Sequence, residues 1–432
     1  MDDTIRFIDL FAGIGGIRQG FELACKKHGY KTTCVLTSEI KPHAIRILQQ
    51  NHPNEKVSGD ITQISSSSIP DFDFLLAGFP CQAFSSAGRR LGFLDTRGTL
   101  FFEIERILSE KKPRGFILEN VEGLVTHDRV DRKDKVGRTL TTILDRLNGL
   151  GYNISWKVLD AKNFGVPQER KRIYIVGTKD SSPNLQSPPL ITSSVGEIIE
   201  KGLVTSDSDF VKLLLNHYTT DDLYGKAIKD KRGGYDNIHS WDIELKGKVS
   251  EEQKTLLNQI LKERRKKKWA EQYGIDWMDG MPLTLENIRS FYDHNNLEKL
   301  LADLVEKKYL KMEHPKKKVE NGRKQDETLP LGYNIVTGKM SFEVNKILDP
   351  NKCAPTLVAM DMKHIYVVDG IGIRNLSLRE GLRLFGYPES FKFEIEKELG
   401  YDLLGNTVVV PVVTFVADSL LKAITRSELL VS

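Results

Sequence analysis

The chain has 432 residues, 40% of them hydrophobic and 28% charged, so it can bury a sizeable core and is not compositionally disordered. Its formal net charge of +4 is mild for this length and favours a local basic surface over a uniformly basic protein. The four cysteines are widely spaced, with no CxxC pair and no nearby histidine at ligand spacing. This spacing argues against a zinc site and a disulfide framework, and so for a reducing compartment.

The first residues, Met1 to Thr4, are acidic and lead directly into a strand, so we expect no signal peptide. No run of about twenty apolar residues predicts a membrane span. The sequence therefore predicts a soluble, monomeric, cytoplasmic protein with no metal and no membrane partner.

In chain order, an apolar strand over residues 5–12 runs into Gly13-Ile14-Gly15-Gly16, and a helix is expected over 17–28. A strand, a glycine turn and a helix form a nucleotide-binding opening, because glycines let the backbone approach a ligand closely. The spacing is GxGG rather than the GxGxxG of dinucleotide sites, and a plain tight turn would use the same residues.

Two carboxylates follow at expected strand ends. Residues 33–38 form a strand that ends at Glu39, and a shorter segment over 57–59 ends at Asp60. A carboxylate at the tip of the second strand is placed to accept hydrogen bonds from ribose hydroxyls. Either acid alone would be a solvated surface charge, but both together, after a glycine turn, indicate a cofactor edge.

The next apolar run, residues 72–77, leads into Gly78-Phe79-Pro80-Cys81. A cysteine at the carboxyl end of a buried strand lies where open α/β sheets hold their chemistry, and Pro80 stiffens the turn. The alternative is a packed core thiol, because free cysteine is among the most buried residues. Beyond it, Arg89 and Arg90 lie among glycines in a loop that either contacts phosphate or is simply solvated.

A strand over 115–118 ends in Glu119-Asn120-Val121. A carboxylate there is expensive to desolvate, so its pKa should rise, which suits a group that shares a proton with a substrate. Capping of the next turn is the alternative role. Helices expected over 99–111 and 137–150, with strands over 153–159 and 173–176, complete an alternation that predicts a doubly wound, mostly parallel sheet.

From about residue 181 the character changes. Ser- and Pro-rich connectors lead into a Lys-rich region, 190–370, that lacks the alternation and reads as a second domain. Helices are expected over 251–271 and 297–312. The basic runs at 264–268 and 316–318 are either solvated faces or phosphate contacts.

Two final segments complete the chain. A short helix that ends in Gly-Tyr-Pro is expected over residues 378–388. A last helix is expected to begin within residues 404–411, with Asn406 at its start. We expect that helix to pack back on the first domain. The expected division is therefore a catalytic domain of residues 1–180 and 400–432, with a smaller inserted domain of residues 181–399.

Short blocks along the chain, in this order, resemble those of the DNA (cytosine-5) methyltransferase family. The blocks are Phe7 to Gly16, Glu39, Asp60, Gly78 to Ser86 around Cys81, Glu119 to Val121, Gln168 to Arg172, Arg379-Glu380 with Leu384 to Pro388, and Gly405 to Val408. They cover roughly residues 1–180 and 370–432 and leave the central part unmatched.

The resemblance implies an α/β fold: a doubly wound, Rossmann-like, S-adenosylmethionine-dependent methyltransferase sheet with an inserted target-recognition domain. It implies Cys81 as the nucleophile, Glu119 as the group that hydrogen-bonds the cytosine, and Arg172 with Arg170 as contacts to the base carbonyl or supports of the loop. The implied cofactor residues are Phe11, Gly13, Gly15, Gly16, Glu39, Asp60, Ile61, Pro80, Leu100 and Asn406. Weak candidates for DNA contact are Arg89, Arg90, Arg232 and Lys248.

The implied reaction is methylation of carbon 5 of a cytosine flipped out of double-stranded DNA, with a companion restriction endonuclease acting on the same site. A tRNA cytosine-5 methyltransferase on the same scaffold is an alternative, although the long, basic central domain favours duplex DNA. A catalytically silent DNA-binding protein is disfavoured by the set Cys81, Glu119 and Arg172. A nicotinamide oxidoreductase is disfavoured by the GxGG turn and by the lack of a hydride-shuttling His or Tyr constellation.

Overall fold

The structure is a computed structural model that describes residues 4–79, 100–131, 133–186, 188–231, 233–234, 236–275, 280–319, 322–337 and 342–430, with no side chains beyond 424. The chain forms two compact units. The first unit holds Met1–Glu200, Pro350–Lys363 and Leu376–Ser432, and the second holds Lys201–Asp349 and His364–Asn375.

The boundaries of these units differ from the expected boundaries, which lie at residues 181 and 399. Residues 181–200, 350–363 and 376–399 all lie in the first unit. Backbone bonds explain the difference: the amide of Glu169 donates to the carbonyl of Ala354 at 2.8 Å, and the amide of Val195 to that of Lys352 at 3.0 Å. The connector residues therefore continue the first unit instead of leaving it.

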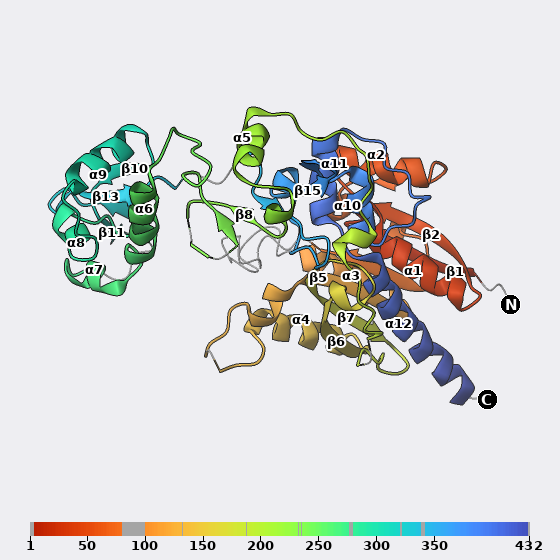
Figure 1. Cartoon of the computed structure of the whole chain (residues 1–432). Coiled ribbons are helices and arrows are strands. Elements are labelled where there is room, and N and C mark those ends of the chain that lie inside the picture. Colours follow the sequence, from red (N-terminus) through yellow and green to blue (C-terminus); the bar gives the residue numbers. More distant parts are fainter. Residues whose placement is uncertain are drawn as a thin grey trace. The chain divides into compact units, whose positions relative to one another are not determined.

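The first unit is organised on a seven-stranded sheet of order β3-β2-β1-β4-β5-β7-β6 (Figure 1). Its strands are β1 (Thr4–Leu10), β2 (Lys31–Ser38), β3 (Val57–Ser58), β4 (Phe74–Gly78), β5 (Gly115–Val121), β6 (Asn153–Asp160) and β7 (Lys171–Thr178). Strands β1 to β5 run parallel, and β7 pairs antiparallel with both β5 and β6. The predicted doubly wound, mostly parallel sheet is confirmed. Its strand order reverses between β1 and β4, the position at which such sheets bind ligands beyond their carboxyl ends.

Helices cover both faces of this sheet. They are α1 (Gly16–Lys27), α2 (Pro42–Asn51), α3 (Leu100–Lys111), α4 (Arg138–Gly149), α10 (Leu378–Leu384), α11 (Lys397–Asn406) and α12 (Val410–Leu430). On one face, Ile8, Leu75 and Phe116 of the strands pack in one core with Ile104 of α3 and Ile143 of α4. This core holds the strand ends that carry the candidate site in fixed register.

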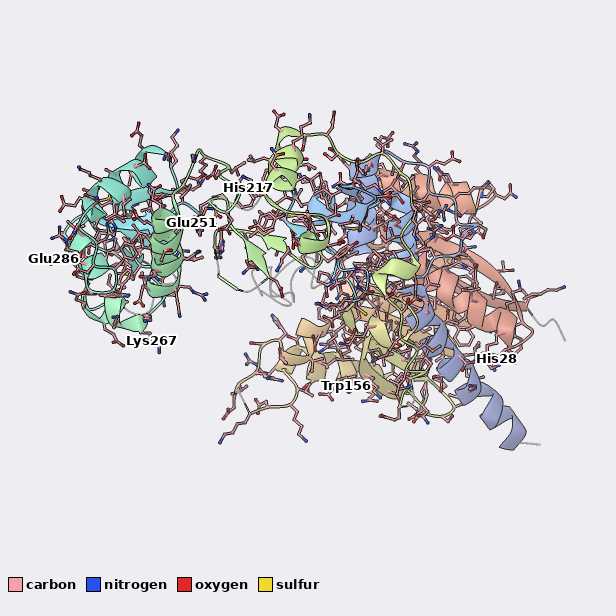
Figure 2. All side chains as sticks on the ribbon, viewed as in Figure 1. His28, Trp156, His217, Glu251, Lys267 and Glu286 are labelled. Carbon is pink, nitrogen blue, oxygen red and sulfur yellow. The ribbon has the colours of Figure 1, made fainter. Side chains whose placement is uncertain are left out.

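On the other face, α1 and α12 lie side by side (Figure 1). A Cβ added at Gly20 of α1 would lie 2.6 Å from the Cβ of Val413, so only glycine permits this approach. At the end of α1, His28 (Figure 2) lies with its Nε2 2.9 Å from Oδ1 of Asp418 in α12. The end of the chain therefore completes the first unit, as expected.

The stretch Lys397–Ile424, which spans α11 and α12, is long and apolar enough to cross a membrane, with mean hydropathy 1.8. This contrasts with the expectation that the chain has no run of this kind. However, 78% of an apolar 18-residue part of this stretch is buried inside the protein, and α12 packs against α1 and the sheet. Its apolar character is that of a core helix.

The second unit contains a five-stranded sheet of order β16-β15-β14-β8-β9. Its elements are α5 (Asp209–His217), β8 (Ala227–Ile228), β9 (Asn237–Ile238), β14 (Lys346–Ile347), β15 (Ile365–Asp369) and β16 (Gly372–Asn375). A small core that includes Val211, Ile228 and Tyr366 holds α5 against these strands. Short strands from both ends of the unit thus share one sheet.

A separate core within the second unit is mainly helical. Its elements are α6 (Glu251–Glu263), α7 (Lys267–Glu271), α8 (Leu285–Arg289), α9 (Leu297–Glu306), β10 (Leu310–Glu313) and β13 (Gly332–Ile335). Glu251, Lys267 and Glu286 mark α6, α7 and α8 in Figure 2. Trp241, Leu257 and Leu301 are among the side chains buried in this core.

Two helix predictions in this region are corrected. The helix expected over 251–271 breaks at Arg264, whose guanidinium turns inward to Asn334 at 2.7 Å. The helix expected over 297–312 ends at Glu306, because Lys308 adopts a φ of +61° and the next residues pair antiparallel with β13. Both corrections come from long-range contacts that a local apolar period does not record.

Candidate active site

Glu119 lies in β5 at the carboxyl end of the parallel strands. It stands in register with Gly78 of β4 on one side and Tyr174 of β7 on the other. Its side chain is buried, with 9% of the residue exposed. Burial raises the pKa of the Glu119 carboxyl, and the charges of Arg172 and Arg170 partly oppose that rise. A carboxyl with a raised pKa keeps its proton to a higher pH than an ordinary glutamate, which suits a group that shares a proton with a substrate.

Arg172 is the direct partner of Glu119. Its Nε lies 3.2 Å from Oε1 of Glu119, and both side chains are largely shielded from water. The pairing follows from strand register, because Arg172 of β7 stands opposite Val121, two residues beyond Glu119. The structure thus brings together two of the residues expected to be catalytic.

The chain leaves β4 beside this pair. A Cβ placed on Gly78 would lie 3.6 Å from Oε2 of Glu119, and Nδ2 of Asn120 donates to the carbonyl of Phe79 at 3.2 Å. Pro80 and Cys81 come next, and they lie outside the described residues, as do Arg89 and Arg90. Asn120 therefore fixes the backbone immediately before the expected nucleophile to the strand that carries Glu119.

Arg170 has different surroundings from those expected of a catalytic group. Its guanidinium donates to the carbonyls of Leu357 at 2.8 Å, Thr407 at 2.8 Å and Gly405 at 3.2 Å, and it lies over the ring of Phe385. These contacts join three distant chain segments in the first unit. We propose that Arg170 positions the site and acts on Glu119 only through its charge.

The expected cofactor edge starts at the turn after β1. Gly13 has a φ of +55°, and a Cβ there would meet no atom within 4 Å. Its amide donates to Oε2 of Glu39 at 2.7 Å, while Oε1 accepts from the amides of Ile40 and Lys41, both at 2.8 Å. Glu39 thus holds the glycine turn and the end of β2 together, with open space on the turn.

Phe11 precedes that turn in a backbone conformation rare for aromatic residues. Its φ is +55°, a value that strains any residue with a Cβ. Strain of this kind persists only where the surroundings enforce it, and it is concentrated at functional sites. The half-buried ring of Phe11 therefore fits a ligand-facing role.

Asp60 and Ile61 follow β3. Oδ1 of Asp60 accepts from the amide of Thr62 at 2.9 Å, which starts a short 3-10 helix at the buried Ile61. Arg106 of α3 secures this turn by donating to the carbonyl of Ile64 at 3.0 Å and to the hydroxyl of Ser66. Leu100 is the first residue of the same helix α3 and is half-buried. No signal in the sequence points to Arg106, because most of its partners lie far away in the chain.

Asn406 differs from its expected setting, and Gly16 lies close to other protein atoms. Asn406 is the last residue of α11, not the start of a helix, and its Nδ2 donates to the carbonyl of Asp402 at 2.7 Å. A Cβ at Gly16 would lie 2.6 Å from Oη of Tyr387 and 2.9 Å from Oγ1 of Thr407. Gly16 thus serves close packing at the start of α1, while Gly15, with a φ of +82°, caps that helix.

Asp9 is a candidate that the sequence analysis missed. It lies in β1 between Ile8 and Leu10 with 1% of its surface exposed, and neither carboxyl oxygen has a hydrogen-bond partner among the described residues. A lone acid inside an apolar strand was the available signal. Burial raises the pKa of Asp9 to about 8, with Arg18 opposing the rise.

Together these residues fit S-adenosylmethionine, the cofactor that the resemblance implies. The open turn at Gly13 admits a ligand, Glu39 and Asp60 offer acceptors at adjacent strand ends, and the strained Phe11 offers a ring. Asp9 adds a buried carboxyl oxygen without a protein partner near the same strand ends.

Replacing Asp9 with asparagine is expected to change how stability depends on pH. The ordinary pKa of 3.8 applies to the unfolded chain and about 8 to the folded one, so between pH 4 and pH 8 only the folded protein keeps this proton. Stability therefore falls as pH rises through that window, by about 1.4 kcal/mol per pH unit for one proton. Asn cannot titrate, so Asp9→Asn should remove this contribution.

Urea unfolding of wild type and Asp9→Asn at pH 5, 6, 7 and 8 gives the free energy of unfolding at each pH. The effect is the difference between the two proteins in the slope of that free energy against pH. Asp71→Asn is the matched control, because Asp71 is exposed and its pairing with Lys111 at 3.1 Å is a surface contact. Parallel stability profiles for wild type and Asp9→Asn would contradict the prediction.

The other cysteines do not compete with Cys81 as a nucleophile. Burial raises the pKa of Cys25 and of Cys34 to about 12 and also raises the pKa of Cys353, so their thiols stay protonated. In the part of the chain that the structure describes, no three His, Cys, Asp or Glu side chains gather in a way that could hold a metal.

Of the weak DNA-contact candidates in the second unit, the structure describes Lys248 but not Arg232. Lys248 is exposed, and its carbonyl accepts from Nζ of Lys307 at 2.8 Å. Its role in DNA binding stays a prediction.

Comparisons with known proteins bear on the family and the fold of the chain. Residues 5–422 match the family model described as C-5 cytosine-specific DNA methylase. Over 417 residues the chain is 62% identical to Type II methyltransferase M.NlaIV of Neisseria lactamica, which covers 96% of this chain and 99% of the relative. It is 42% identical to Type II methyltransferase M.BanI of Aneurinibacillus aneurinilyticus, with 96% and 95% covered.

Among solved structures, the Entamoeba histolytica methyltransferase EhMeth superimposes with a TM-score of 0.54 at 16% identity, covering 98% of this chain and 99% of that one. The S. pombe Dnmt2 methyltransferase gives a TM-score of 0.50 at 16% identity with the same coverage. These two likenesses concern the fold alone.

Proposed function

Since the chain belongs to the C-5 cytosine-specific DNA methylase family, we propose that it methylates carbon 5 of a cytosine swung out of double-stranded DNA, through a transient bond to Cys81. The enzyme is a DNA cytosine-5 methyltransferase related to Type II restriction–modification methyltransferases. S-adenosylmethionine would supply an electrophilic methyl group.

The observation that carries the mechanism is the buried pair of Glu119 and Arg172 beside the exit of β4. Carbon 5 of cytosine is a poor nucleophile, and a thiolate added at carbon 6 turns the ring into an enamine that can attack a methyl group. Negative charge then develops on the ring nitrogen and exocyclic amine. The Glu119 carboxyl, with its raised pKa, can share a proton there.

The bonds that form on the cytosine are balanced by bonds that break. The thiolate of Cys81 bonds to carbon 6, and carbon 5 would take its methyl group from the sulfonium, which would leave as a neutral thioether. The proton on carbon 5 then passes to water or another base as the sulfur–carbon bond breaks and the thiolate of Cys81 is released. Arg172 holds Oε1 of Glu119 at 3.2 Å, which leaves Oε2, on the side of Gly78, for the substrate. The backbone anchored by Asn120 sets where Cys81 begins its turn.

A base inside a DNA duplex cannot reach a thiol at the end of a β-strand of the protein. The target cytosine must therefore leave the base stack, at a cost of about a few kcal/mol. The second unit is then the part proposed to hold the duplex and recognise its sequence. In a bacterial cytoplasm this modification would protect DNA from a companion endonuclease acting on the same site, as the Type II relatives' names suggest for those proteins.

Bisulfite sequencing of DNA from cells that express the chain is expected to show unconverted cytosines in one short sequence context and nowhere else. The purified protein should transfer labelled methyl groups to duplex DNA and not to tRNA. Conversion equal to the empty-vector control, or label found only in tRNA, would reject the proposed DNA substrate.

A further inference from the structure

The two-stranded ribbon β11 (Lys316–Val319) and β12 (Gly322–Gln325) of the second unit has an unusual composition. Of its eight residues, five are Lys or Arg and none is acidic. Seven of the eight are exposed, and Lys316 is half-buried. Figure 1 labels β11. The ribbon therefore has no apolar face packed on a core.

Its strand register places like charges opposite each other. Lys317 stands across from Lys324, and Lys318 across from Arg323. Like charges in directly opposed positions destabilise a strand pair, and a lone two-stranded ribbon is marginal in water. Folding stability alone does not explain this pattern.

The base of the ribbon is held firmly. Nζ of Lys317 lies 2.6 Å from Oδ2 of Asp326, the amide of Asp326 donates to the carbonyl of Pro315 at 2.9 Å, and Oδ1 of Asp326 accepts from Thr328. Nδ1 of His314 lies 2.7 Å from the carbonyl of Leu329. The closed base keeps the two basic strands in a fixed position.

Beyond that base, Lys318 and Lys324 are exposed, and neither has an ion-pair partner within the described ranges. The other basic run of this unit, 264–268, is largely occupied. Arg264 is buried against Asn334, and the Nζ atoms of Lys266 and Lys268 lie 2.5 and 4.0 Å from oxygens of Glu263. Lys318 and Lys324 therefore keep charge that no ion pair among the described residues neutralises.

We propose that the ribbon β11–β12 binds the phosphate backbone of duplex DNA, with Lys318 and Lys324 as the contacting side chains. The phosphates of the DNA backbone offset the repulsion between the opposed cations. A two-stranded ribbon also has dimensions that fit beside or within a DNA groove. The contact is independent of sequence and adds affinity without reading bases. The inference rests on the proposed function, since it takes duplex DNA as the substrate.

The test uses the full chain with Lys318→Ala and Lys324→Ala combined. Equilibrium binding to a duplex with the methylated sequence and to an unrelated duplex is measured between 50 and 200 mM salt. Two lost phosphate contacts should reduce the slope of log K against log salt by about 1.8 and weaken both duplexes by the same factor. The double Lys→Arg variant should bind like wild type.

The matched control is Lys262→Ala with Lys299→Ala. These lysines are exposed on α6 and α9, with no ion pair recorded for either in the described part of the chain, and the change in charge is the same. It should leave the slope unchanged. An equal effect from this control would mean that net charge, not the ribbon, governs binding.

The remaining outcomes separate this inference from the proposed function. If wild type methylates DNA and the ribbon variant keeps the full salt slope, the ribbon assignment is overturned and the function stands. Weaker binding to the methylated sequence alone would replace phosphate contact with base recognition. Ribbon-dependent binding to vesicles of anionic lipid, with DNA binding intact, would also overturn the assignment. A wild-type chain that neither binds nor methylates DNA rejects the proposed function itself.

Discussion

Replacing Cys81 with alanine is expected to abolish methyl transfer while binding of S-adenosylmethionine is retained. Without the sulfur no enamine forms, and loss of a covalent nucleophile slows other enzymes on the order of 10⁶-fold. Cofactor binding should persist because Glu39 and Asp60 lie at other strand ends. Single-turnover transfer of labelled methyl and calorimetric titration of the cofactor measure the two properties.

Cys353→Ala is the control, because burial raises the pKa of that thiol and it has no expected role in the reaction. A duplex that carries 5-fluorocytosine should form a stable adduct with wild type and none with Cys81→Ala. Turnover retained by Cys81→Ala, or an adduct on another residue, would refute the covalent mechanism.

Replacing Glu119 with glutamine is expected to slow the chemical step by about 10² to 10⁴-fold, the usual contribution of a positioned proton donor or acceptor. Glutamine keeps the shape of the side chain but removes the ionisation that burial has shifted upward. Single-turnover rates with saturating DNA, measured from pH 6 to pH 9, isolate this step. The pH dependence that comes from Glu119 should be missing in the variant.

Glu122→Gln changes an exposed acid three residues further along and should leave the rate unchanged. Thermal unfolding of both variants is the second control, because Glu119→Gln also removes the ion pair with Arg172. A variant that unfolds earlier yet reacts at the wild-type rate would limit Glu119 to a structural role.

The sequence predicted the sheet well because its signals are local. The strands β4 and β5 are apolar runs that reach a glycine or an acid, and the structure places Glu39, Asp60 and Glu119 at or just beyond the carboxyl ends of strands. The pairing of Glu119 with Arg172 is harder to predict from the sequence, because it depends on β7 running antiparallel beside β5. No spacing in the sequence specifies that register.

The errors share one cause, which is contact between residues far apart in the chain. Asn406 was placed at a helix start because the apolar run continues beyond it, whereas α11 ends there and α12 begins at Val410. The contacts of Arg170 also depend on the fold, which directs its donors at three backbone carbonyls, and its part in the reaction stays a prediction. The apolar neighbours of Asp9 in β1 are visible in the sequence, but only the fold shows that its carboxyl is buried without a hydrogen-bond partner among the described residues.

The contact between α1 and α12 has a consequence during synthesis of the protein. Gly20 and Val413 touch, so the sheet face that α1 covers is incomplete until the ribosome has added nearly four hundred further residues. A chain interrupted before α12 would lack the partner of α1 and expose apolar surface to chaperones and proteases. We therefore expect fragments that end before α12 to be unable to complete the first unit.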